Sequence, residues 1–117
     1  MKTRTGWLGD LPIEMKVAEG PWERMRGLLA RSPLVAGQGL LIQPCNMVHT
    51  WGMRYPLDLV FVSRPGRILQ IAAHVHPRRV RACWGARAVI ELPPGDVERR
   101  ALEPGMTAPE QLMADGS

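Results

Sequence analysis

The sequence predicts an α+β fold: one compact domain with a largely antiparallel sheet, or a partly closed barrel, of about five or six short strands. Three observations support this class. The chain has 117 residues, which is a usual size for one domain. Short apolar runs alternate with Gly and Pro turns, and most connections are too short for a parallel crossover. Only one segment has the spacing of a substantial helix.

The first elements follow from the spacing of apolar residues. Apolar and polar residues alternate over residues 11–17, which predicts a strand with one buried face. Gly20 and Pro21 end this strand. Apolar residues then recur at three- and four-residue intervals, which predicts the one main helix near residues 21–31. Because the residue before a proline avoids the α conformation, Pro33 limits the helix.

The remaining elements are short. A Pro-Gly turn at residues 64–66 predicts that residues 57–62 and 67–75 pair as an antiparallel hairpin. Asp96 is expected to cap a helical turn that runs to Arg100. The other predicted strands span residues 39–42, 47–50 and 86–92.

Composition indicates a soluble, cytoplasmic protein. Hydrophobic residues make up 45% of the chain, enough for a folded core. We find no secretion signal and no apolar run of the ~18 residues that a membrane helix requires. In a reducing cytoplasm, Cys45 and Cys83 are expected to be free thiols. The expected domain spans residues 11–106, between an N-terminal extension at 1–10 and a polar tail at 107–117.

Positive charge is concentrated in one stretch of the chain. The net charge is +4, and no acidic residue lies between Asp58 and Glu91. Six arginines fall in that interval: Arg64, Arg67, Arg78, Arg79, Arg81 and Arg87. One interpretation is a solvated arginine face, and the alternative is a site for a polyanion such as nucleic acid. We favour the solvated face because no base-stacking aromatics or nucleic-acid motif are identified.

Four residues form the candidate site: Cys45, His49, Asp58 and Glu91. Cys45 and His49 are four residues apart, so they share a face in a helix or in a strand. The favoured function is a binding or accessory module with a polar pocket for a small or anionic ligand. The alternative is a small thiol-dependent enzyme, in which His49 activates Cys45 and Asp58 orients the imidazole.

Asp58 and Glu91 interrupt apolar strands, so their carboxylates require partners. Arg26 and Arg31 are the expected partners. They would form a clamp between helix and sheet, or present a guanidinium to an anionic ligand. The candidate binding residues are therefore Arg26, Arg31, His49, Thr50, Met53, Asp58 and Glu91.

Other chemistry is not indicated by the sequence. Trp51, Met53 and Trp84 are expected to fill the core more readily than to line a ligand pocket. Potential metal ligands are present without a Cys-x-x-Cys pair, so no metal site is predicted: Cys45, His49, His74, His76 and Cys83. No Walker loop, dinucleotide motif, hydrolase elbow or zincin motif occurs, and we expect no cofactor.

Six motifs in order resemble the domain-of-unknown-function family 192, and the resemblance covers Ile13 to Gly105. The motifs are RGLL-x-R at 26–31, GLL at 39–41, VHT-x-GM at 48–53, LD-x-x-F at 57–61, AVIEL at 88–92 with Gly95, and EPG at 103–105. The resemblance implies a small α+β domain and no particular reaction. The chain departs from the family pattern at Met106, where an aspartate is common.

Overall fold

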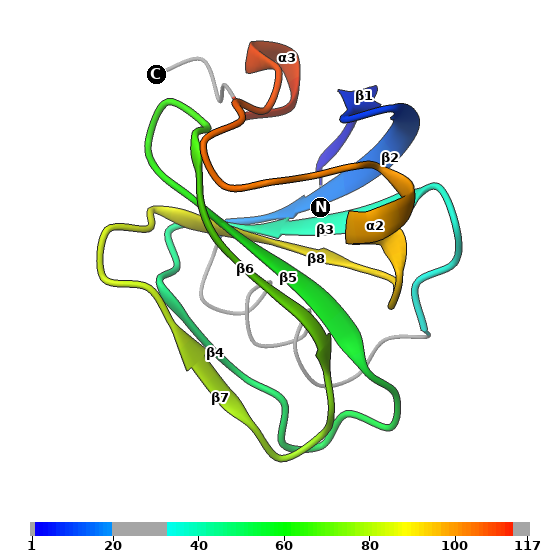
Figure 1. Ribbon diagram of the computed structural model, residues 1–117, viewed down its shortest axis with the longest axis vertical. Coiled ribbons are helices and arrows are strands. Elements are labelled where there is room, and N and C mark those ends of the chain that lie inside the picture. Colours follow the sequence, from blue (N-terminus) through cyan, green and yellow to red (C-terminus); the bar gives the residue numbers. More distant parts are fainter. Residues whose placement is uncertain (1, 20–32, 114–117) are drawn as a thin grey trace.

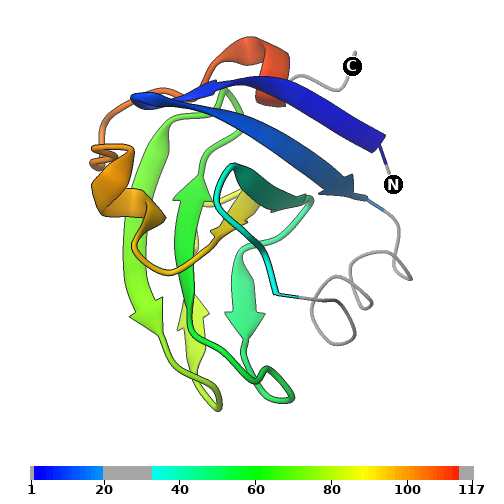
Figure 2. The ribbon, with the colours of Figure 1, turned by 90° about the vertical axis from the view of Figure 1, so that its right-hand side faces the viewer.

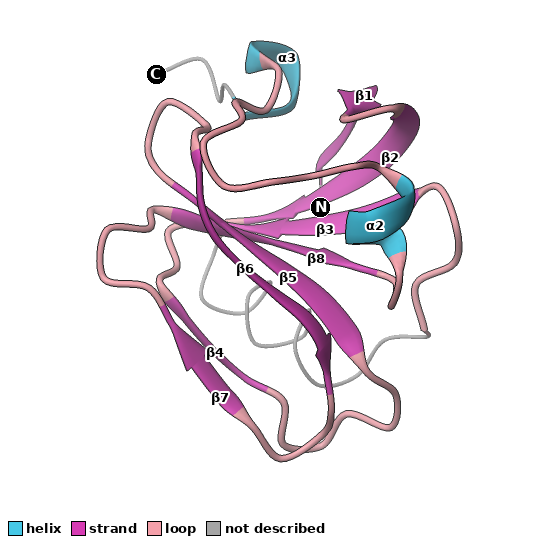
Figure 3. Ribbon diagram, viewed as in Figure 1, coloured by secondary structure: helices cyan, strands magenta, loops and turns pink. Residues whose placement is uncertain are grey.

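The structure is a computed structural model that describes residues 2–19 and 33–113. The main helix predicted near residues 21–31 lies outside the described residues. Strands and two short helices make up the described part (Figure 1, Figure 3). The strands are β1 Lys2–Leu8, β2 Leu11–Ala18, β3 Gln38–Ile42, β4 Met47–His49, β5 Leu57–Val62, β6 Ile68–Val75, β7 Val80–Ala82 and β8 Ala88–Leu92, and the helices are α2 Asp96–Arg99 and α3 Glu110–Met113.

Six strands form one sheet in the order β1-β2-β3-β8-β5-β6, while β4 and β7 form a separate two-stranded ribbon. Among the described strands, β2 and β3 pair in parallel and all other pairs are antiparallel. Because β1 and β6 are free edges of this order, the sheet is not closed and the expected partly closed barrel is wrong. The broader prediction, a sheet-rich α+β domain, is confirmed.

Strand β5 has the predicted bounds, and its antiparallel hairpin with β6 is confirmed. The sequence does not predict β1 or β7, because most of their side chains are exposed and leave no apolar periodicity. A two-residue turn joins β1 to β2. Gly9 in this turn has a φ of 63°, which favours glycine. No helix in the described part of the chain is long and apolar enough to cross a membrane.

Both terminal segments contact the sheet. Strand β1 comes from the expected extension at residues 1–10, and α3 comes from the expected polar tail at 107–117. Leu112 is fully buried, and the guanidinium of Arg4 donates to its backbone oxygen at 2.9 Å. Figure 2 shows α3 beside the β1–β2 hairpin. The tail is therefore packed as far as Met113, the last described residue.

Apolar side chains are buried on both faces of the sheet. Every residue of β5 is buried, because both faces of this central strand are covered. Val60 and Val62 belong to the cluster that includes Leu112, beneath the segment that follows α2 (orange in Figure 1). Leu59 and Phe61 pack on the other face with Val48 of β4. The β4–β7 ribbon thus covers part of the second face.

Candidate functional site

Asp58 and Glu91 do not share a pocket. Strands β5 and β8 pair so that Asp58 lies opposite Leu92, and Leu59 lies opposite Glu91. Directly opposed residues point to the same face of a sheet, and successive residues point to opposite faces. The two carboxylates, both fully buried, therefore lie on opposite faces. The four candidate residues do not form one site.

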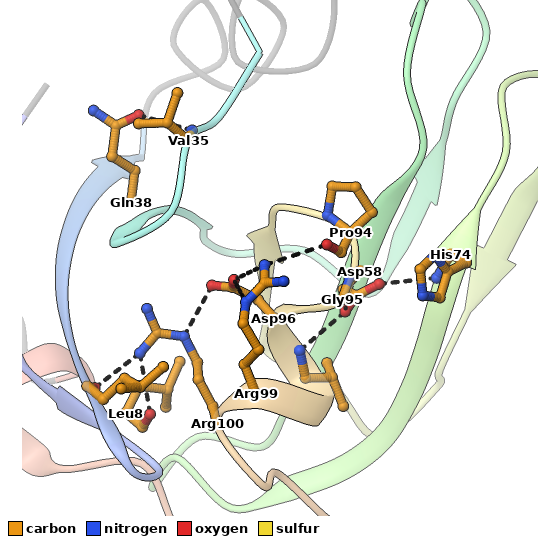
Figure 4. Close-up of polar contacts among 12 residues, drawn as sticks. Leu8, Val35, Gln38, Asp58, His74, Pro94, Gly95, Asp96, Arg99 and Arg100 are labelled. Carbon is orange, nitrogen blue, oxygen red and sulfur yellow. Dashed lines mark hydrogen bonds and ion pairs between the residues drawn. The ribbon is translucent and has the colours of Figure 1, made fainter.

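The Asp58 carboxylate binds backbone amides of strand β6 and of the start of α2 (Figure 4). Its Oδ1 accepts a hydrogen bond from His74 N–H at 2.9 Å. Its Oδ2 accepts from Gly95 N–H at 3.1 Å and from Val97 N–H at 3.0 Å. His74 has a φ of 50° where the β5–β6 register shifts, so Asp58 binds an amide exposed by the bulge. The second oxygen caps the first turn of α2, a role expected for Asp96.

These contacts correct two expectations for Asp58. Its oxygens are used by backbone amides, so Asp58 does not orient the His49 imidazole. An arginine guanidinium was the expected partner of the Asp58 carboxylate, but the same backbone amides take that place. Arg26 and Arg31, the expected cations of the clamp, lie outside the described residues.

Cys45 precedes the short strand β4, and His49 is the last residue of that strand. The Sγ of Cys45 donates to the backbone oxygen of Met47 at 3.2 Å. The exposed His49 ring meets the Trp51 ring edge-on, with centroids 6.3 Å apart and planes at 63°. No disulfide joins Cys45 and Cys83, as predicted. Activation of Cys45 by His49 stays a prediction.

Thr50 joins the loop after β4 to the loop before β7. Its side chain is buried, and its hydroxyl donates to the backbone oxygen of His76 at 2.7 Å. The same hydroxyl accepts from Arg79 N–H at 2.9 Å, and Thr50 N–H donates to the Arg79 oxygen at 2.9 Å. Met53 packs against the apolar cluster under the ribbon. Both candidate binding residues therefore have contacts that hold the fold together.

Replacing Thr50 with valine is expected to destabilise the protein. The substitution keeps the side-chain shape but leaves Arg79 N–H and the His76 oxygen without the hydroxyl, at a cost of about 1–2 kcal/mol. Thr50→Ser keeps the hydroxyl and should retain most of the stability. Urea unfolding measures both variants. Equal stability of Thr50→Val and Thr50→Ser would contradict the assigned role of the hydroxyl.

The sequence analysis missed a buried polar cluster around Arg100 (Figure 4). Arg100 is 1% exposed, and its Nε donates to Asp96 Oδ2 at 3.0 Å. Its Nη1 donates to the backbone oxygens of Leu8 at 3.1 Å and Leu11 at 2.8 Å, and its Nη2 donates to Pro12 O at 3.1 Å. Arg100 thus fastens α2 to the β1–β2 hairpin. One sequence feature could have indicated this cluster: Asp96 and Arg100 are four residues apart and directly follow a Pro-Pro-Gly turn.

A groove of about 780 Å³ lies between the β5–β6 turn and α3. None of the candidate site residues is among the described residues that line this groove. Two guanidinium groups, from Arg64 and Arg87, line it together with hydroxyls. The lining residues are Glu19, Gln43, Pro44, Ser63, Arg64, Pro65, Arg87, Ala88, Thr107, Ala108, Glu110 and Met113. This mixture of polar groups and open volume suits a small polar ligand.

Metal-ligating side chains are dispersed in the described structure. Within residues 2–19 and 33–113, no three His, Cys, Asp or Glu side chains gather closely enough to hold a metal ion. His74 and His76 are both exposed. Because His74 lies at the bulge, the regular strand geometry expected for this pair is interrupted.

The fold and these contacts define a small, sheet-rich domain in which buried polar side chains hold the loops together. The chain belongs to the domain-of-unknown-function family 192, described as "Uncharacterized ACR", whose model matches residues 3–108. This match confirms the resemblance drawn from the six motifs. No curated protein matches the chain.

Two solved structures share the fold. A protein from Novosphingobium aromaticivorans DSM 12444, described as of unknown function, is 26% identical with a TM-score of 0.76. That match covers 92% of this chain and 81% of the other. A protein from Sinorhizobium meliloti 1021, described as a candidate transcription regulator, is 23% identical with a TM-score of 0.77 and covers 88% of each chain. The second likeness concerns the fold alone.

Proposed function

We propose that the protein is a small cytoplasmic binding module that takes a carboxylate- or phosphate-bearing molecule in the groove beside α3. The observation that carries the proposal is the pair Arg64 and Arg87. Both side chains are exposed and line the groove, and neither forms an ion pair within the described residues. A cytoplasmic location agrees with Cys45 and Cys83 not being joined in a disulfide.

The backbone brings the two arginines close to each other. Arg87 N–H donates to the backbone oxygen of Val62 at 2.8 Å, two residues before Arg64 in the chain. Two carboxylates, from Glu19 and Glu110, also line the groove. The Oε1 of Glu19 lies 3.7 Å from Lys2 Nζ, which partly compensates the charge of Glu19. Guanidinium groups present forked donors that match the oxygens of carboxylates and phosphates. Such a ligand therefore matches the two guanidinium groups at the wall formed by Arg64 and Arg87.

The proposal is tested by titrating inorganic phosphate and citrate into the isotope-labelled protein and following backbone amides by NMR. We expect saturable shifts at groove residues. Arg64→Gln and Arg87→Gln should each weaken binding about tenfold, since a hydrogen bond to a charged group is worth ~1.5 kcal/mol or more. Arg67→Gln is the matched control, because Arg67 is exposed nearby but does not line the groove. Equal weakening by the control, or no saturable shift with either anion, would contradict the proposal.

A further inference from the structure

The β4–β7 ribbon presents a continuous row of apolar and aromatic side chains to solvent. Residues Met47 and His49 alternate along β4, and Val80 and Ala82 alternate along the antiparallel β7. Met47 lies opposite Ala82, and His49 opposite Val80, so these four share one face. All four are exposed, whereas Val48, on the other face, is buried in the core. We call these four residues, with Trp51 and Trp84, the ribbon face.

A tryptophan lies beyond each end of this face. Trp51 follows His49 by two residues and is 50% exposed; Trp84 follows Ala82 by two residues and is 87% exposed. At about 3.3 Å per residue, the ribbon between them is up to roughly 20 Å long. Such exposure is unusual for tryptophan, which normally buries most of its surface. The expectation that these residues fill the core is wrong, and two exposed indole rings are present.

The charge near the ribbon face is positive. Arg78 and Arg79 immediately precede β7. Arg81 lies within β7 opposite Val48, and therefore on the other face of the ribbon. The Nη1 atoms of Arg79 and Arg81 donate only to nearby backbone oxygens, at 2.8 to 3.4 Å. In the described residues, none of these arginines forms an ion pair with a carboxylate, and none of residues 59–90 is acidic. An anionic partner would therefore meet attraction without nearby repulsion.

We propose that the ribbon face binds single-stranded nucleic acid. Trp51 and Trp84 stack on bases, while Arg78 and Arg79 contact phosphates. Flat rings interleaved with cations are the two components of sequence-tolerant single-strand binding. Figure 1 shows the ribbon at the lower left, beside the lower parts of β5 and β6.

An anionic membrane surface is the competing partner, and the composition of the face disfavours it. Membrane binding scales with buried apolar area, and the aliphatic contribution here is limited to Met47, Val80 and Ala82. The two cations beside the ribbon face, Arg78 and Arg79, are arginines, whose planar groups bind phosphates in a forked geometry and stack on rings. The narrow ribbon therefore matches a polynucleotide better than a lipid surface.

The test is fluorescence anisotropy with a labelled oligothymidylate of about 12 nucleotides, within the site sizes of single-strand binders. Trp84→Ala should weaken binding about tenfold, the loss expected for one stacked base. Arg78→Gln combined with Arg79→Gln should reduce the slope of log affinity against log salt by about 1.4, the value for two single-strand phosphate contacts. Trp84 is so exposed that its removal should leave the urea midpoint unchanged.

Trp7→Ala provides the matched control, because Trp7 is 58% exposed on β1, outside the ribbon. It should bind the oligonucleotide as the wild-type protein does. Equal weakening by Trp7→Ala and Trp84→Ala would overturn the proposal, as would absence of saturable binding at low salt. Binding to phosphatidylglycerol vesicles that depends on Trp84, without oligonucleotide binding, would also overturn it and assign the face to a membrane.

Discussion

Replacing Arg100 with alanine should lower the free energy of unfolding by about 3–5 kcal/mol, the cost of breaking a buried ion pair. Arg100 is 1% exposed and donates to Asp96 and to three backbone oxygens of the β1–β2 hairpin. Alanine removes all four interactions and leaves a cavity beneath the hairpin. Urea unfolding followed by circular dichroism measures the loss. Arg100→Lys should be intermediate, because an ammonium can neutralise Asp96 but cannot span the same set of oxygens.

The Arg99→Ala variant shows whether the stability lost in Arg100→Ala comes from the burial of the arginine or only from its charge. Arg99 also binds Asp96, through Nη2 at 2.6 Å, but its side chain is 51% exposed. Exposed ion pairs contribute about 0–1 kcal/mol, so this variant should remain close to wild type. If Arg99→Ala and Arg100→Ala lose equal stability, the buried network around Arg100 does not have the assigned role.

The sequence predicts those strands whose side chains carry a pattern. Strand β2 alternates between exposed and buried positions, and β5 is a continuous apolar run, so both are predicted. Strand β1 pairs through its backbone along the sheet edge while most of its side chains are exposed, and no periodicity marks it. The parallel pairing of β2 with β3 depends on the course of the chain between them, which spacing does not encode.

The candidate site shows a similar limit. An aspartate at position 58 within an apolar strand indicates a buried carboxylate that requires donors, and the burial is confirmed. Its donors are backbone amides, which every residue except proline possesses, so no sequence pattern identifies them. The opposite orientation of Glu91 follows from strand register, which composition does not determine.

The solvent exposure of Trp51 and Trp84 is likewise not predicted by composition. Trp84 is apolar enough to be expected in a core, yet it lies in the turn after β7 and is 87% exposed. Without knowledge of this exposure, the sequence disfavours the polyanion alternative, because it identifies no aromatic side chains available for stacking. The structure changes that inference, since Trp51 and Trp84 are exposed just beyond the paired residues of the ribbon.

Replacing Asp58 with asparagine should cost about 2–4 kcal/mol, although the side chain has nearly the same size. Both carboxylate oxygens accept hydrogen bonds from buried backbone donors, and an amide group offers only one oxygen. Its NH₂ would face a donor in either orientation, which leaves that donor unsatisfied and removes a charge-assisted bond. Asp10→Asn is the control, because Asp10 is exposed and should change stability by less than about 0.5 kcal/mol.

Amide hydrogen exchange in Asp58→Asn identifies where the stability is lost. The carboxylate holds the β6 bulge at His74 with one oxygen and the first turn of α2, through Gly95 and Val97, with the other. Because these amides lose their acceptor, we expect them to exchange faster relative to the β5 amides, which retain their partners in the sheet. If exchange became equally faster at all amides of the sheet, the variant would be destabilised globally, without local opening at the bulge and at α2. Unchanged exchange together with wild-type stability would show that Asp58 does not couple the bulge to α2.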